Sequence, residues 1–123
     1  MKVLICDDDK CIVDEIKNNL NTFSDKHRIV FDIDLFYNGV ELLNSNISYD
    51  MAFIDIEMPL VNGLTLSAQL KKVNSNIIIF IITSHDAYLD DAMDLDVFRY
   101  LSKPIDNNRF FRALNTAINY YHS

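Results

Sequence analysis

The amino-acid sequence predicts an α/β fold in which five parallel strands form one sheet, with helices covering both of its faces. Three observations support this fold class. Short apolar runs of strand length alternate with longer stretches whose apolar residues recur at helical spacing. Residues 77–82, the most apolar run, are mostly β-branched, as expected for a central strand that is buried on both faces. Residues that favour turns or helix starts, such as Gly39 and Asn62-Gly63, separate several of the runs.

The first half of the chain contains three predicted strands and two predicted helices. In order, they are a strand at residues 2–6, a helix at 10–23, a strand at 28–36, a short helix at 40–43 and a strand at 51–54. The first helix is predicted from four apolar residues at helical spacing, Ile12, Ile16, Leu20 and Phe23. The second strand is predicted from residues that alternate with charged or other side chains, Ile29, Phe31, Ile33 and Leu35.

The second half of the chain completes the alternation. In order, we expect a helix at residues 64–72, a strand at 77–82, an acidic helix at 86–94, a strand at 97–101 and a last helix. Asp106 is the expected N-cap of this last helix, because its short carboxylate can accept from the first free backbone N–H groups. One apolar stripe is expected along this helix, formed by Phe110, Leu114, Ala117 and Tyr121.

Composition limits the function classes. The chain has 123 residues, of which 50% are hydrophobic, and a length that fits one domain over residues 1–123. A net charge of -7 argues against binding nucleic acid or an anionic membrane by charge. The longest apolar run is too short to cross a bilayer, and no signal peptide is expected. Cys6 and Cys11 lack the CxxC spacing, so we expect reduced thiols in a cytoplasmic protein.

Polar residues follow four of the five predicted strands. Asp7 and Asp8 follow the first strand, and Asp55 follows the third. Thr83 follows the fourth strand, and Lys103 follows the fifth. Taken singly, an Asp after a strand is most often a turn former or a helix N-cap. Because the carboxyl ends of parallel strands share one edge of the sheet, all five residues together indicate a ligand site there.

The chemistry of such a cluster points to phosphoryl transfer. Neighbouring carboxylates repel one another and hold protons more tightly unless a cation lies among them. Oxygen ligands without His or Cys favour Mg²⁺, with Mn²⁺ as a second possibility. A carboxylate can itself act as a nucleophile and form an aspartyl phosphate. An ammonium and a hydroxyl group would then stabilise the oxygens of the transferring group.

These residues and their spacing resemble the receiver domain of two-component response regulators over nearly the whole chain. The motifs that carry the resemblance are Cys6-Asp7-Asp8-Asp9, Phe53-Ile54-Asp55-Ile56-Glu57-Met58-Pro59, Asn62-Gly63, Thr83-Ser84 and Tyr100-Leu101-Ser102-Lys103-Pro104. Each motif is weak alone, but their order and spacing together are specific. The resemblance implies a flavodoxin-like doubly wound sheet with strand order 2-1-3-4-5.

The resemblance also implies a phosphoacceptor and a metal site. Asp55 would accept the phosphoryl group. Asp8 and Asp55 would bind Mg²⁺ directly, Asp7 would bind it through water, and the backbone carbonyl of Glu57 would be a further ligand. Asp9 stands where the family more often has Glu, a mild departure that puts little in doubt.

Three further positions acquire roles from the resemblance. Thr83 would hydrogen-bond the phosphoryl oxygens, Lys103 would pair with them, and Tyr100 occupies the aromatic switch position. A cis peptide bond between Lys103 and Pro104 is expected. Glu57 and His85 follow Asp55 and Thr83 by two residues; one hypothesis is that they set how readily water attacks the phosphoaspartate, and the alternative is that both are solvated loop residues.

The implied output is a change in one surface of the domain. Phosphorylation by a sensor histidine kinase would shift the surface formed by the 86–94 helix, the fifth strand and the last helix. Charges of opposite sign on these elements could pair in a homodimer, or they could simply be solvated: Asp90, Asp91, Asp94, Asp96, Arg99, Arg109 and Arg112. Within the family, the segments around His85 and Tyr100 resemble receivers joined to LytTR-type DNA-binding domains. Control of transcription would then require an output domain absent from this chain.

Two other functions compete with a regulatory phosphoacceptor that catalyses only its own phosphorylation and autodephosphorylation. A haloacid-dehalogenase-like phosphohydrolase also uses an Asp nucleophile and Mg²⁺, but Asp55-Ile56-Glu57 lacks the second Asp of its DxD motif. A receiver-like interaction module that is never phosphorylated need not retain the whole set of site residues. No membrane partner is expected.

Overall fold

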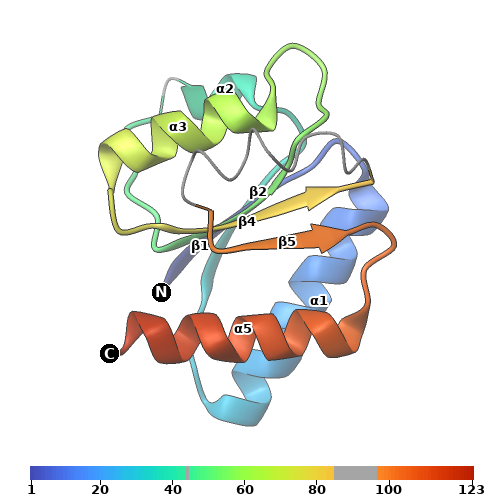
Figure 1. Cartoon of the computed structure of the whole chain (residues 1–123), viewed down its shortest axis with the longest axis vertical. Coiled ribbons are helices and arrows are strands. Elements are labelled where there is room, and N and C mark those ends of the chain that lie inside the picture. Colours follow the sequence, from blue (N-terminus) through green and yellow to red (C-terminus); the bar gives the residue numbers. More distant parts are fainter. Residues whose placement is uncertain (44, 85–96) are drawn as a thin grey trace.

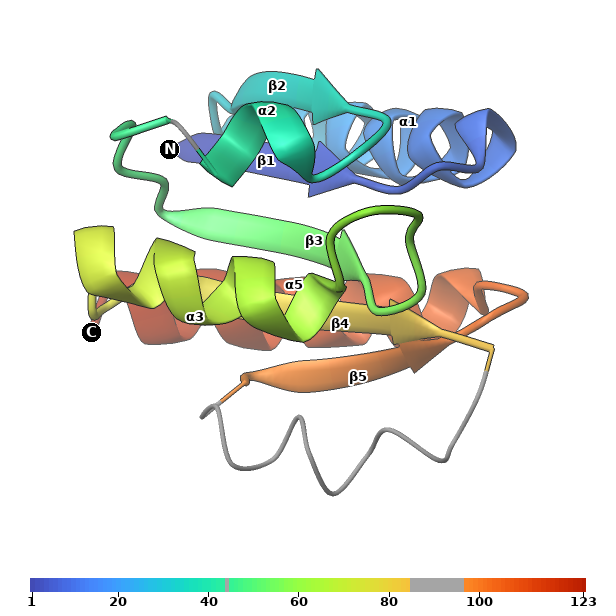
Figure 2. The same cartoon turned by 90° about the horizontal axis from the view of Figure 1, so that it is seen from above.

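The structure is a computed structural model that describes residues 1–43, 45–84 and 97–123. Its five strands form one parallel sheet in the order β2-β1-β3-β4-β5, which confirms the expected topology (Figures 1 and 2). The strands are β1 (Lys2–Cys6), β2 (Asp32–Phe36), β3 (Met51–Asp55), β4 (Ile78–Thr83) and β5 (Arg99–Ser102). The described helices are α1 (Lys10–His27), α2 (Val40–Leu43), α3 (Gly63–Val73) and α5 (Asn107–Tyr121).

The helices cover the two faces of the sheet and divide the core into two clusters. Figure 1 shows α1 and α5 on one face and α2 and α3 on the other. Alternate residues of β1 point to opposite faces: Val3 and Ile5 join the cluster under α1 and α5, whereas Leu4 and Cys6 join the cluster under α2 and α3. Every residue of β3 and β4 is buried, because these strands lie inside the sheet with helices on both sides.

Short polar side chains begin the long helices. Asp9 caps α1 by accepting from the backbone N–H of Cys11, and Asn62 caps α3 by accepting from that of Leu64. Asp106 caps α5, as predicted, by accepting from the backbone N–H of Arg109. None of the described helices is both long enough and apolar enough to cross a membrane.

The predicted start of the second strand is wrong. The first helix continues past Phe23 to His27, and Arg28 then ends it in the left-handed conformation, with φ 55° and ψ 44°. The backbone N–H of Arg28 donates to the Ser24 carbonyl, so residue 28 belongs to the helix end rather than to a strand. The polar last turn of α1 carries no apolar periodicity, which is why the sequence pattern placed the boundary too early.

The start of β5 and one residue of the α5 stripe also differ from the prediction, and one expectation remains untested. β5 begins at Arg99, two residues after its predicted start. The buried stripe of α5 contains Ile118 instead of Tyr121, whose side chain is 41% exposed near the end of the helix. The acidic helix predicted at 86–94 lies outside the described residues.

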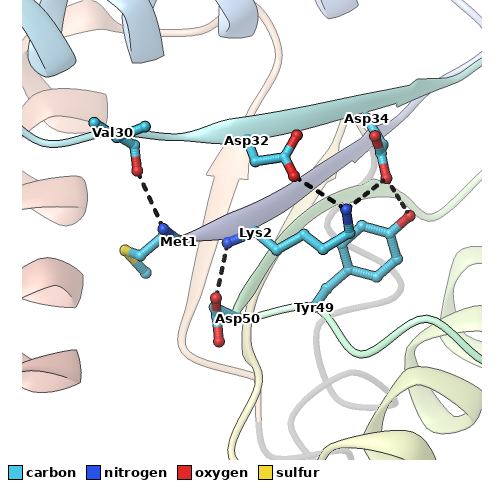
Figure 3. A network of polar contacts seen from close by, with 7 residues as sticks. All are labelled: Met1, Lys2, Val30, Asp32, Asp34, Tyr49 and Asp50. Carbon is cyan, nitrogen blue, oxygen red and sulfur yellow. Dashed lines mark hydrogen bonds and ion pairs between the residues drawn. The ribbon is translucent and has the colours of Figure 1, made fainter.

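A polar network lies at the amino ends of the strands (Figure 3). The Lys2 ammonium lies 3.1 Å from Asp32 Oδ2 and 3.7 Å from Asp34 Oδ2. The Tyr49 hydroxyl donates to the same Asp34 oxygen at 2.7 Å, and the backbone N–H of Lys2 donates to Asp50 Oδ2 at 2.7 Å. These contacts join β1, β2 and the segment that leads into β3.

Candidate functional site

The acidic residues predicted from the strand ends meet at the carboxyl edge of the sheet. Asp7 and Asp8 follow β1 directly, and Asp55 is the last residue of β3, which pairs with β1. One oxygen from each of the three carboxylates lies within 4.8 Å of the other two. Asp7 is fully buried and Asp55 is 4% exposed, whereas Asp8 faces solvent. The cluster is therefore open to solvent on the side of Asp8.

A tight turn after β3 holds Asp55 in place. The chain folds back over residues 56–62, and the backbone N–H of Gly63 donates to the Ile56 carbonyl at 2.9 Å. A Cβ atom at Gly63 would lie 2.1 Å from the Asp55 carbonyl oxygen and 2.9 Å from Ile56 Cα. No side chain fits between these backbones, which explains the glycine of the Asn62-Gly63 motif.

Lys103 joins the cluster from β5. Its ammonium lies 3.0 Å from Asp7 Oδ2 and 3.5 Å from Asp55 Oδ2. Its backbone N–H donates to the Thr83 carbonyl at 3.0 Å, which ties the start of the following loop to the end of β4. The peptide bond between Lys103 and Pro104 is cis, as predicted. One cation thus faces two buried carboxylates.

The electrostatics of the cluster are unbalanced. Burial raises the pKa of Asp55 to about 6; the charge of Asp7 raises it further, and Lys103 only partly opposes the rise. Burial also raises the pKa of Asp7, against the hydrogen bond from the Asp9 backbone and the ammonium of Lys103. Burial alone would lower the pKa of Lys103, but the close contact with Asp7 and the charge of Asp55 outweigh it and raise the pKa.

These residues fit a hard divalent cation. Asp7 Oδ2 is buried and, among the described residues, has no well-aligned hydrogen-bond donor, although the Lys103 ammonium lies near it. A buried carboxylate oxygen without a full set of partners is costly, and a cation would satisfy it. All three side chains offer oxygen, the ligand atom that Mg²⁺ prefers. Asp8, on the open side, leaves room for water.

The other predicted residues lie at or near the same edge. Thr83 is 3% exposed and follows Ile82, which pairs with Asp55 in the sheet register. Tyr100 is half-buried against the cluster under α2 and α3. The Glu57 side chain is exposed, while its backbone N–H hydrogen-bonds the Asp55 carboxylate. His85 lies outside the described residues, so its predicted tuning role remains untested.

Sequence reasoning missed two features of the site. The backbone N–H of Asp9 donates to Asp7 Oδ1 at 2.9 Å, so Asp9 orients the buried carboxylate as well as capping α1. Its position before a helical pattern is a signal for the cap, whereas the contact with Asp7 has no signal in the sequence. The Cys6 thiol, buried beneath the cluster, contacts Met58 Sδ at 3.6 Å and the Asn38 carbonyl at 3.5 Å. Sequence alone carries no signal for this contact between loops.

Comparisons with known proteins show which family the sequence matches. The sequence model of the family described as the response regulator receiver domain matches residues 3–115. Sensory transduction protein LytR of Staphylococcus haemolyticus is 30% identical over 115 residues, which cover 94% of this chain and 44% of that protein. Sensory transduction protein LytT of Bacillus anthracis is 31% identical over 114 residues, which cover 93% of this chain and 46% of that protein.

A solved structure extends the comparison to the fold. The BeF3-activated receiver domain of DrrB superimposes with a TM-score of 0.82 at 17% sequence identity, covering 96% of this chain and 97% of that one. At this identity the likeness concerns the fold alone. The chain spans about half the length of the curated relatives that it matches.

Proposed function

Because the chain belongs to the family of response regulator receiver domains, we propose that the site at its carboxyl edge accepts a phosphoryl group on Asp55. Receiver domains are the regulatory phosphoacceptor domains of two-component systems, and the curated relatives include LytR- and LytT-type regulators. The observation that carries the proposal is the buried cluster in which Asp7, Asp8 and Asp55 meet one lysine. Residues 1–123 form a single receiver domain in this proposal.

The proposed reaction is nucleophilic displacement by a carboxylate. A carboxylate oxygen of Asp55 attacks the phosphorus of a phosphohistidine on a sensor histidine kinase. The new O–P bond forms while the P–N bond breaks, and the imidazole of the kinase leaves with the electron pair of that bond. Asp55 suits this role because it stands at the end of β3 on the side where Asp8 leaves the cluster open to solvent.

Lys103 and Thr83 would stabilise the transferred group. The Lys103 ammonium already lies within 3.5 Å of Asp55 Oδ2, so a phosphoryl group on Asp55 would lie within its reach. Thr83 follows the β4 residue that pairs with Asp55, and its hydroxyl would donate to a phosphoryl oxygen. These donors oppose charge that develops on the phosphoryl oxygens during transfer.

The carboxylates would also hold Mg²⁺, with Mn²⁺ as an alternative. Asp7, Asp8, Asp55 and the backbone carbonyl of Glu57 are the proposed ligands. The bound cation would neutralise negative charge between the acceptor and the phosphoryl group. The exposed Glu57 side chain, together with His85, would tune attack by water on the phosphoaspartate.

The proposed output is a change at Thr83 and Tyr100. When Thr83 moves toward the phosphoryl group, the half-buried Tyr100 packs inward and changes the surface that includes β5 and α5. Arg99, Arg109 and Arg112 lie on these elements and could pair with acidic residues of a second copy of the chain, in a homodimer. DNA would be bound only by an output domain outside this chain, and the protein would act in the cytoplasm.

Intact mass after incubation with Mg²⁺ and acetyl phosphate tests the proposal. The wild type should gain one phosphoryl group, about 80 Da, and the Asp55→Asn variant should gain none. Asp34→Asn is the matched control, because Asp34 also stands on a strand but near the amino edge. A wild type that gains no mass would favour a receiver-like interaction module. Turnover of a generic phosphate ester would favour a phosphohydrolase of the haloacid dehalogenase class.

A further inference from the structure

Asn19 is the one polar residue among the buried residues of α1. The others are Val13, Ile16, Leu20 and Phe23. Asn19 is 8% exposed, and its side-chain Nδ2 donates to Asn107 Oδ1 at 3.1 Å. A buried amide without a partner is destabilising, so this hydrogen bond allows Asn19 to lie among apolar neighbours. The bond joins two residues that are 88 positions apart in the sequence.

Asn107 lies at the end of the loop that carries Lys103. It is the first residue of α5 and directly follows the N-cap Asp106. The loop between Lys103 and Asn107 is held at two points. The Lys103 backbone N–H donates to the Thr83 carbonyl, and the Ile105 side chain is buried in the core. The Asn19 side chain therefore adds a polar contact between the far end of this loop and α1, beside the apolar packing of Ile105.

The helix α1 is in turn attached to the acidic cluster. Its N-cap Asp9 donates its backbone N–H to Asp7 Oδ1 at 2.9 Å. The helices α1 and α5 thus each begin within a few residues of one partner in the Asp7–Lys103 ion pair. The Asn19–Asn107 hydrogen bond closes this arrangement, since it ties the two helices to each other on one face of the sheet.

We propose that Asn19 and Asn107 are positioning residues for Lys103. Their hydrogen bond holds the start of α5 in register with α1, and thereby keeps the Lys103 ammonium within reach of both Asp7 and Asp55. A partly buried polar contact of this kind can fix the register between two helices. The inference rests on the proposed function, because it concerns the lysine that would stabilise the phosphoryl group on Asp55. Neither asparagine contacts the reacting atoms.

The first test is the initial rate of phosphorylation by acetyl phosphate and Mg²⁺, followed by intact mass. Asn19→Ala and Asn107→Ala should each lower the rate about three- to tenfold, since small displacements of a positioned group cost rate. The double variant should be no slower than the slower single variant, because one hydrogen bond is lost in all three. The matched controls are Asn18→Ala and Asn108→Ala, which change exposed neighbours of the same residue type and should leave the rate unchanged.

The second test distinguishes positioning of Lys103 from general loosening of the fold. In a Lys103→Ala background, with higher acetyl phosphate and longer incubation, adding Asn107→Ala should change the rate by less than about 1.5-fold. An equal loss of rate with and without Lys103 would overturn the proposal, as would equal losses in the two control variants. Asn107 is exposed, so its variant can be studied even if Asn19→Ala fails to fold.

A conservative replacement provides the rescue. Asn19→Asp can accept a hydrogen bond from the amide of Asn107 after that amide rotates, so its rate should return to within about twofold of wild type. A variant that folds but remains as slow as Asn19→Ala would contradict a role for this hydrogen bond. Failure of the wild type to be phosphorylated on Asp55 would instead contradict the proposed function, which separates the two failures.

Discussion

Both ends of the sheet place a lysine between two aspartates, but the two groups differ in burial and in hydrogen-bond partners. At the amino edge, Lys2 lies between Asp32 and Asp34, and the Tyr49 hydroxyl supplies a second donor to Asp34 (Figure 3). The side chain of Asp32 is 68% exposed and that of Asp34 34% exposed, so water completes their solvation. This network satisfies its charges and joins β1 to β2.

At the carboxyl edge, the carboxylates have less solvent and fewer hydrogen-bond donors than at the amino edge. Asp7 and Asp55 are buried, and a single lysine faces both of them. One Asp7 oxygen lacks an aligned donor among the described residues, and burial raises the pKa of Asp55 to about 6. The comparison indicates that an aspartate at a strand end stabilises the fold only where water or hydrogen-bond donors solvate its carboxylate. A cluster left incomplete is suited to bind a cation and react with a phosphoryl group.

The largest expected effect concerns the close backbone packing at Gly63, beside Asp55 at the carboxyl edge. Gly63→Ala should lower the free energy of unfolding by about 3 kcal/mol, because the new Cβ would collide with the Asp55 and Ile56 backbones. Urea denaturation measures this loss. Gly39→Ala is the matched control: its Cβ would meet the Val61 side chain at 3.0 Å, and the loss should be nearer 1 kcal/mol. Equal losses in the two variants would contradict a special constraint beside Asp55.

The next prediction is that a carboxylate lowers the free energy of unfolding at the carboxyl edge and raises it at the amino edge. Without divalent cations, Asp55→Asn should raise the free energy of unfolding by about 1–2 kcal/mol at pH 7.5, because it removes a buried charge that repels Asp7. Asp34→Asn should lower it, because Lys2 and Tyr49 lose their charged partner. Urea denaturation in EDTA checks both signs. Destabilisation by Asp55→Asn would contradict this prediction, because it would show that Lys103 and the backbone donors outweigh the repulsion between Asp55 and Asp7.

The pH dependence should follow from the raised pKa of Asp55. Its folded pKa of about 6 lies above the ordinary value of 3.8, so the folded state binds this proton more tightly than the unfolded state. Stability is therefore lost as pH rises from about 4 toward 6 and above, and the wild type should be about 1 kcal/mol more stable at pH 5 than at pH 7.5. Asp55→Asn should remove most of this difference, and the buried Asp7, whose pKa is also raised, should account for what remains. If the wild type and Asp55→Asn had the same dependence of stability on pH in EDTA, a raised pKa of Asp55 would be contradicted.

The smallest expected effect comes from the amino edge. Tyr49→Phe removes one hydroxyl that donates to Asp34 and keeps the buried ring, so it should cost about 0.5–1 kcal/mol. Thermal and urea denaturation measure the loss, and the phosphorylation rate should be unchanged because Tyr49 lies far from the carboxyl edge. A slower rate at unchanged stability would mean that the two edges are coupled.

Much of the fold could be predicted because it depends on local patterns. Four apolar runs and one alternating pattern located the five strands, and the rule that parallel strands share a carboxyl edge brought Asp7, Asp55 and Lys103 together correctly. The order of the strands came from the resemblance, since periodicity does not specify which strands are neighbours. The cis bond before Pro104 had the same origin.

What could not be predicted depends on contacts between distant segments. Lys2 meets Asp32 only because of the register between β1 and β2, and Asn19 meets Asn107 only because α1 and α5 cross on one face. The end of α1 at Arg28 also escaped prediction, since the left-handed conformation there is adopted by a residue other than glycine. Burial of the acidic cluster, and hence the raised pKa of Asp55, required the packed structure.

The most direct test of the contrast is a titration with Mg²⁺ followed by thermal denaturation. A ligand that binds only the folded state stabilises it in proportion to the logarithm of its concentration above Kd. We predict that Mg²⁺ raises the Tm of the wild type and of Asp32→Asn by the same amount, and that Asp8→Asn and Asp55→Asn lose most of this gain. Equal stabilisation of all four proteins, or none in the wild type, would contradict the assignment of the cation site to the carboxyl edge.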